Sequence, residues 1–227
     1  MARFASSSAV FALLLAASAA ASARDSEWWS YRDAYRSMVQ FEKYGRAKNF
    51  LQQHLQVMPK EKGASTDGLR LTLATAAAQR NLPLDAAGRA VFPLLKAAYD
   101  DNAVLQLNRP AGQYALRVRV TVAVRADAVY EAADLRAACA QALDVLQYGG
   151  AARGLRCVGL RFVFAPGSAG AMLKIKDGAS LAATEGAPFA DDPRDSFRVV
   201  NYRFADTPAR GQVQSGDAPL LISTLFE

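Results

Sequence analysis

The chain has 227 residues, of which 52% are hydrophobic and 21% charged, with two cysteines, one histidine and a formal charge of +6. This composition excludes an intrinsically disordered chain, a disulfide-rich miniprotein and a collagen-like or low-complexity sequence. It also disfavours most acid–base, triad and zinc chemistry, because His54 is the one residue that can supply an imidazole.

The first 23 residues have the pattern of a secretory signal peptide. Arg3 gives a basic start, residues 10–17 form an apolar run, and small residues at positions 21–23 precede Arg24. The apolar run is shorter than the roughly 20 residues that a transmembrane helix needs. We therefore expect a soluble mature chain from residue 24 onward, periplasmic or secreted, with no transmembrane segment and no nucleic-acid partner.

A helix is predicted directly after the signal peptide. Ser26 can cap it, and Trp28, Tyr31, Tyr35 and Met38 recur on one face of a 3.6-residue repeat that ends near Gly45. The aromatic residues here, including Trp29, could form a stacking platform for a sugar or an interfacial anchor. We favour a core position for them, because aromatic residues at helical spacing usually pack inward.

Several strands are predicted in the first half. Residues 50–58 favour a strand, and residues 69–73 alternate in polarity as a second one, so the two make a plausible hairpin. Residues 104–108 and Tyr114–Arg125 predict another hairpin, with a long alternation in the second run. Its polar side carries Arg117 and Arg119, our only candidate ligand-binding residues, although we favour a solvated strand face as the explanation for them.

The second half begins with a predicted helix over residues 127–147, with Cys139 on its apolar stripe. Short strands follow, at 156–164, 172–175, 198–204 and 220–226. The fold class is therefore α+β, predominantly antiparallel β in a sandwich or sheet, with two helices. Residues 24–227 form a single β-rich domain or two β modules, near 24–126 and 127–227; short matches at residues 66–68 and 176–178 hint at the latter.

Cys139 and Cys157 are the only thiols, and an oxidising compartment permits a disulfide between them. The return of the chain from helix to strand can bring them close enough. The two residues could also remain separate buried thiols, because Cys157 falls on the strand face opposite the apolar residues. Redox catalysis is disfavoured, since the sequence contains no C-x-x-C motif.

Catalytic motifs are missing from the sequence. Ser168 does not lie in a nucleophile elbow, because Pro166 stands where that motif requires glycine. His54 is flanked by polar residues and has no metal-binding or triad pattern around it. We therefore predict no catalytic residue, no metal site and no cofactor.

The segment Leu82–Pro93, followed by Tyr99–Ala103 and Leu105–Gly112, resembles an uncharacterised family of exported proteobacterial proteins with a domain of unknown function. The resemblance covers about 30 residues closely and the rest of the mature chain loosely. It implies a periplasmic location and a β-rich fold, and it supplies no site residues.

We expect a non-catalytic binding or interaction protein of the bacterial cell envelope, whose partner is another envelope protein or an envelope polymer. The alternative is a periplasmic hydrolase that acts on an envelope substrate through His54 or through carboxylates. A cleft that joins His54 to a serine or aspartate would favour the hydrolase. A solvated His54 and a groove lined by Arg117, Arg119 and aromatic residues would favour binding.

Overall fold

The computed structural model describes residues 28–150, 154–176 and 178–227, so the predicted signal peptide lies outside the described residues. Its strands form three antiparallel sheets. The largest has seven strands, in the order β12 (Thr184–Gly186), β13 (Phe197–Arg203), β9 (Cys157–Phe164), β15 (Leu221–Phe226), β7 (Tyr114–Val122), β2 (Leu51–Pro59) and β5 (Arg89–Ala90). The predicted α+β class with mostly antiparallel strands is therefore confirmed.

Two smaller sheets accompany this central sheet. One has the strand order β1 (Trp28–Ser30), β6 (Val104–Leu107), β3 (Leu71–Ala74) and β4 (Gln79–Leu82). The other has the order β11 (Ser180–Ala182), β10 (Met172–Ile175), β14 (Gln212–Ser215) and β8 (Val129–Glu131).

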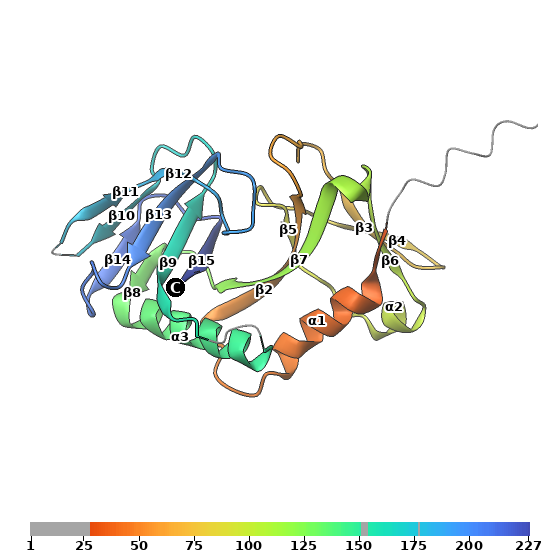
Figure 1. The fold of residues 1–227 in the computed structure, drawn as a ribbon, viewed down its shortest axis with the longest axis horizontal. Helices are drawn as coiled ribbons and strands as arrows, with labels where there is room; N and C mark the ends of the chain where they lie inside the picture. Colours follow the sequence, from red (N-terminus) through yellow and green to blue (C-terminus); the bar gives the residue numbers. More distant parts are fainter. Residues whose placement is uncertain (1–27, 151–153, 177) are drawn as a thin grey trace, which may run out of the picture.

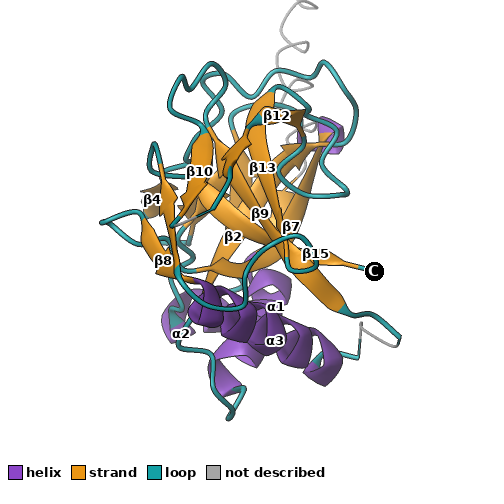
Figure 2. Ribbon diagram, turned by 90° about the vertical axis from the view of Figure 1, so that its left-hand side faces the viewer, coloured by secondary structure: helices purple, strands orange, loops and turns teal. Residues whose placement is uncertain are grey.

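Two long helices, α1 (Tyr31–Lys43) and α3 (Ala132–Tyr148), lie end to end along the lower side of the molecule in Figure 1. A short helix, α2 (Lys96–Asp100), packs near α1, and a single 3-10 turn, η1 (Ala111–Gln113), precedes β7. Figure 2 shows the three α-helices gathered at one end, below the strands.

Most elements and strand pairings occur twice along the chain in the same order, whereas α2, η1 and β12 have no counterpart in the other half. In each half a three-residue strand leads directly into a long helix, as β1 leads into α1 and β8 into α3. Five strand pairings have a counterpart in the other half. In the small sheets, β1·β6 corresponds to β8·β14, β3·β6 to β10·β14 and β3·β4 to β10·β11. In the central sheet, β2·β7 corresponds to β9·β15 and β2·β5 to β9·β13. The two halves meet in the middle of the central sheet, where β7 pairs with β15 through Val122 and Ile222.

Each half buries its own hydrophobic core. The first core packs Tyr31 and Met38 of α1 against Leu55 of β2 and Leu73 and Leu105 of the first small sheet. The second core is built in the same way from α3, the β9 side of the central sheet and the second small sheet, but it also takes in Val122 from β7. Val122 thus extends the second core into the first half of the chain.

The first long helix begins later than the sequence pattern predicted. Ser30, not Ser26, caps it, because the Ser30 hydroxyl accepts a hydrogen bond from the Asp33 backbone N–H at 3.3 Å. Trp28 and Trp29 belong to β1 and point to opposite faces of that strand. Tyr31 is fully buried, as predicted.

Both predicted hairpins are wrong, although their strands exist. β2 pairs with β7 and β5, whereas β3 pairs with β4 and β6, so residues 50–58 and 69–73 lie in different sheets. β6 and β7 are likewise divided between the first small sheet and the central sheet. The turn at residues 108–113 therefore carries the chain from one layer of a sandwich to the other.

Candidate functional site

Cys139 and Cys157 are joined in a disulfide, with their Cα atoms 5.8 Å apart. The bond ties the middle of α3 to the first residue of β9. At this end of β9 the pairing with β15 shifts register between Leu225 and Phe226. The strict alternation of faces, which argued against the disulfide, does not hold across such an irregularity.

Arg117 and Arg119 lie on the face of β7 that is turned away from α1, and both approach Asp191. The Arg119 guanidinium donates to Asp191 Oδ1 at 2.7 Å and to Gln56 Oε1 at 2.7 Å, and it stacks on the Phe189 ring at 4.2 Å. The Arg117 side chain is half exposed and its Nε lies 3.7 Å from Asp191 Oδ2. The structure thus brings the two candidates together, but Arg119 has its donors engaged within the fold.

Arg119 belongs to a larger cluster that joins the two halves of the chain, the arginine cluster. It consists of Gln56, Asp85, Arg89, Arg119, Asp191, Asp192 and Arg194.

The loop before β13 supplies Asp191, Asp192 and Arg194, and the first half of the chain supplies the rest. Buried Gln56 donates to Asp192 Oδ2 at 3.2 Å, and Arg194 donates to the Ala87 carbonyl at 2.9 Å. Three arginines face three aspartates, so the cluster is electrically balanced. We interpret it as a structural junction between the halves.

His54 projects from β2 on the same face as the arginine cluster and is half-buried. Burial lowers the pKa of its imidazole below the ordinary value of 6.5, and the positive charge of Arg89 lowers it further. Within the described ranges, His54 makes no hydrogen bond, and its buried Nδ1 has no partner. No serine or aspartate is therefore oriented against it as a triad would require.

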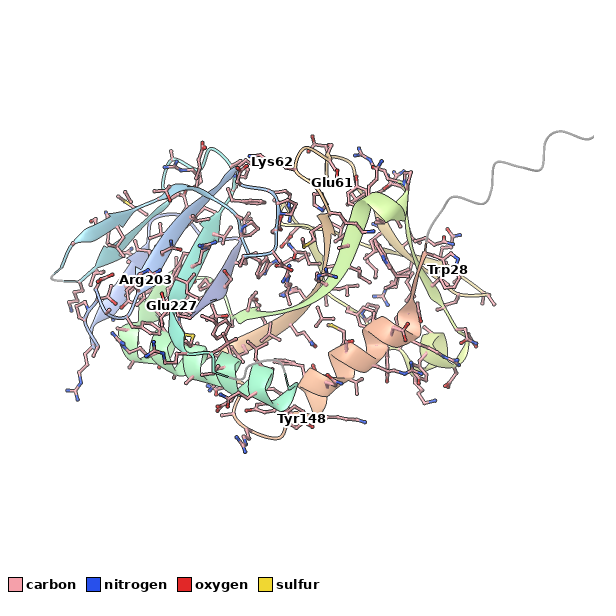
Figure 3. The ribbon with its side chains drawn as sticks, viewed as in Figure 1. Trp28, Glu61, Lys62, Tyr148, Arg203 and Glu227 are labelled. Atoms are coloured by element: carbon pink, nitrogen blue, oxygen red, sulfur yellow. A yellow bond between two sulfur atoms is a disulfide. The ribbon has the colours of Figure 1, made fainter. Side chains whose placement is uncertain are left out.

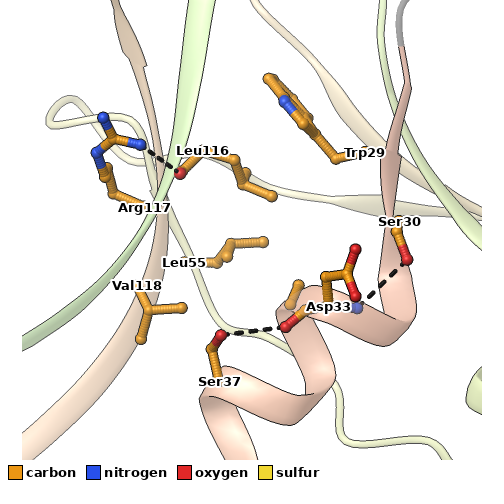
Figure 4. Close-up of a pocket in the computed structure, with 9 residues that line it drawn as sticks. Trp29, Ser30, Asp33, Ser37, Leu55, Leu116, Arg117 and Val118 are labelled. Carbon is orange, nitrogen blue, oxygen red and sulfur yellow. Dashed lines mark hydrogen bonds between the residues drawn. The ribbon is translucent and has the colours of Figure 1, made fainter. Parts of the chain in front are cut away.

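A cleft of about 330 Å³ opens between α1 and the sheet of the first half. Its floor is apolar, formed by Ala34, Leu55, Leu116 and Val118, and Trp29 forms one wall. Figure 4 shows the polar groups of the α1 end along its rim, Ser30, Asp33 and Ser37. Arg117, one of the two predicted ligand-binding residues, also lines the cleft, but its guanidinium is turned away from Trp29 and donates to the Leu116 carbonyl at 3.3 Å.

The second half closes the corresponding space. The fourth residue of α1 is Ala34, whereas the fourth residue of α3 is Leu135, whose side chain is almost fully buried. The middle residue of β1 is half-buried Trp29, whereas that of β8 is Tyr130, which is buried with its ring edge-on to Phe162 at 5.4 Å. The cleft is thus the result of specific small and polar residues in α1, not a general property of this arrangement.

The sequence did not single out this cleft. The Trp28–Trp29 pair was the signal that could have found it, but we assigned both residues to a helix and favoured a core position for them. Arg117 was singled out for a different reason, its place on the polar side of the strand. The other lining residues are aliphatic or belong to the start of α1, and the pairing of β2 with β7 brings Leu55 next to Leu116 and Val118.

Two further findings limit the kinds of site present. Among the residues that the structure describes, no group of three or more histidine, cysteine or acidic residues is placed to hold a metal ion. No helix in the same ranges is long and apolar enough to cross a membrane.

We compared the chain with protein-family models, curated proteins and solved structures, and none of the three comparisons gave a match.

Proposed function

We propose that the protein is an exported, non-catalytic binding protein of the bacterial cell envelope, and that the α1 cleft takes an apolar side chain from another envelope protein. The cleft itself carries the proposal. Its floor is apolar and its volume is at the lower end of the range for ligand pockets, about 300 to 1,000 Å³, which suits one large side chain. Export is supported by the signal-peptide pattern and by the disulfide.

The residues at the rim of the cleft indicate which residue type of the partner should lie next to the inserted side chain. Asp33 lies in the first turn of α1, where a carboxylate is favoured by the helix dipole, and its side chain is largely exposed. Its ion pair with Arg36 is exposed as well, and such pairs contribute little. Asp33 can therefore exchange Arg36 for a basic residue next to the inserted side chain.

The hydrolase alternative has less support. As a base, His54 is poorly placed, because its Nδ1 is buried without a partner and it lies on the opposite face of β2 from the floor of the cleft. The adjacent carboxylates of Asp191 and Asp192 are paired with Arg119 and Arg194. No specific observation among the described residues favours this alternative.

Fluorescence of Trp29 tests the proposal directly. In a Trp28→Phe variant, Trp29 is the only tryptophan, and its emission is titrated with the peptide amides acetyl-Lys-Phe and acetyl-Lys-Ala. We expect a saturable shift with the phenylalanine peptide and none with the alanine peptide.

Ala34→Leu should abolish that shift, because it places in α1 the residue that fills the equivalent space in α3. Ala140→Leu, the same change at an exposed position of α3, is the matched control and should have no effect. Equal responses to both peptides, or normal binding by Ala34→Leu, would refute the proposal.

A further inference from the structure

The outer face of the first small sheet carries an uncharged row of side chains across all four strands. Register pairs Trp28 with Gln106, Gln106 with Thr72, and Thr72 with Asn81, so these four side chains share one face and form a straight row, the tryptophan row. The adjacent row on the same face is Ser30, Val104, Ala74 and Gln79. None of these eight residues is charged, although the chain as a whole carries a formal charge of +6.

The other face of this sheet is the buried one. Trp29, Leu105, Leu73 and Arg80 form the next register row, in which both leucines are fully buried in the first core and Arg80 is exposed on the edge strand β4. Because side chains alternate between faces, the tryptophan row points outward. Trp28 is 59% exposed, and Figure 3 shows it at the outer margin of the molecule, at the start of β1.

The polar members of the tryptophan row are available to bind a ligand. Among the hydrogen bonds between described residues, none involves the side chain of Gln106, Thr72 or Asn81. Such side chains can both donate and accept hydrogen bonds without contributing a charge. An exposed indole next to them offers a large apolar surface with a negative ring face.

The corresponding row in the second half has lost these properties. There register aligns Val129, Gln214, Lys174 and Ser180, so valine stands in the place of Trp28 and lysine in the place of Thr72. Glu131 and Lys176 add further charges next to that row. The glutamine is the same in both rows, whereas the exposed indole and the absence of charge belong to the first half alone.

We propose that the tryptophan row is a binding platform for a neutral glycan chain. A sugar ring presents C–H groups that pack on an indole face, while its hydroxyls match the free amide and hydroxyl groups of Gln106, Thr72 and Asn81. Four strands at a spacing of about 4.8 Å give a row about 14 Å long, so the platform extends over consecutive sugar rings. None of the eight side chains offers a charged partner to a charged polymer. The inference is independent of the α1 cleft, because Trp28 and Trp29 point to opposite faces of β1.

Affinity electrophoresis through gels that contain a neutral glucan, oligomeric N-acetylglucosamine or anionic alginate tests this proposal. We expect at least one neutral glycan, and not alginate, to retard the protein. Trp28→Ala should reduce the affinity at least tenfold, and Gln106→Ala should weaken it several-fold. Val129→Ala, at the equivalent position of the second half, should leave it unchanged, and Ala34→Leu should also leave it unchanged, which separates this site from the cleft.

A transplanted platform provides the complementary test. The triple variant Val129→Trp, Lys174→Thr and Ser180→Asn rebuilds the row in the second half, and calorimetric titration with the retarding glycan should then give two sites per chain in place of one. Melting temperatures within about 2 °C of the parent establish that the variants are folded. Retention by alginate alone, no retention by any of the neutral glycans, or an affinity that Trp28→Ala leaves intact would overturn the proposal.

Discussion

Arg117 and Arg119 are two residues apart on one strand, yet their surroundings differ so much that we expect only Arg119 to contribute substantially to the stability of the fold. The Arg119 side chain is 14% exposed and that of Arg117 is 52% exposed. Removing Arg119 leaves buried Gln56 without one of its partners and leaves Asp191 with a more distant cation, whereas removing Arg117 leaves no buried group unpaired.

We therefore expect Arg119→Ala to lower the free energy of unfolding by about 2–3 kcal/mol, and Arg117→Ala to change it by no more than about 0.5 kcal/mol. Urea denaturation followed by circular dichroism measures both values. Arg119→Lys serves as a control for charge alone, since it keeps the charge but loses the planar contact with Phe189. Equal losses for Arg117→Ala and Arg119→Ala would show that the arginine cluster does not stabilise the fold.

His54 makes stability depend on pH, and the chain contains no second imidazole to obscure the effect. Its pKa in the folded state is lowered below 6.5, chiefly by burial. The unfolded chain therefore binds the proton more readily than the folded chain. The stabilisation is complete above the unfolded-state pKa of about 6.5 and is lost as the pH falls below it, through the lowered folded-state pKa.

Melting temperatures measured from pH 7.5 down to pH 5 should fall more steeply for the parent than for His54→Gln. The single imidazole resonance in a proton NMR titration should give a midpoint below 6.5. A midpoint above 6.5 would contradict the burial of His54, and a decline that is the same in His54→Gln would assign the pH dependence to carboxylates.

At the scale of elements, the disulfide fixes α3 against β9, and α1 has no corresponding bond. Reduction should destabilise the protein by about 3 kcal/mol, the value expected for a covalent loop of this length, whose ends are 18 positions apart. The double variant Cys139→Ser, Cys157→Ser should unfold at the same urea concentration with and without reductant, whereas the parent should lose stability only with reductant. Two free thiols in denatured, unreduced protein would contradict the bond.

The elements themselves were largely predictable from the sequence, but their partners were not. Period-two alternation located β2, β7 and β9, and a 3.6-residue stripe located α3, because these patterns are local. β6 and β7 are consecutive strands with a short turn, which favours a hairpin, yet β6 pairs with β1 and β3. The reason is that each half is a sandwich, and the chain crosses from one layer to the other between β6 and β7 so that both layers bury their apolar faces.

Only two short sequence matches indicated the internal repeat, and the structure shows that they do not lie at equivalent positions. Residues 66–68 precede β3, whereas Lys176 and Gly178 follow β10, the strand that corresponds to β3; residue 177 lies outside the described ranges. The matching turns are therefore not equivalent positions. The cleft and the tryptophan row could not be predicted from the sequence either, because both depend on the register between strands distant in sequence. Whether the halves are one domain or two stays a prediction.

At the scale of the whole molecule, three features tie the halves together. β7 pairs with β15, Val122 of the first half packs in the second core, and the arginine cluster bridges the face away from the helices. A fourth contact joins the helix ends, where Phe41 and Leu51 pack with Ala142 and Phe226. Separating the halves would expose buried apolar and charged groups at each of these places.

We therefore expect the two halves to unfold in one transition. Both tryptophans lie in the first half, so their fluorescence reports on that half alone, whereas far-ultraviolet circular dichroism reports on all strands and helices. The two signals should change at the same urea concentration, as a cooperative unit requires. Asp192→Ala removes a fully buried carboxylate that joins Gln56 to Arg194, so it should lower the urea midpoint of both signals. If this junction couples the halves, the midpoints of the fluorescence and circular dichroism signals should also differ from each other in this variant. Separate transitions in the parent protein would show that residues 28–122 and 129–226 fold independently, and the contacts across β7 and β15 would then be those of two docked domains.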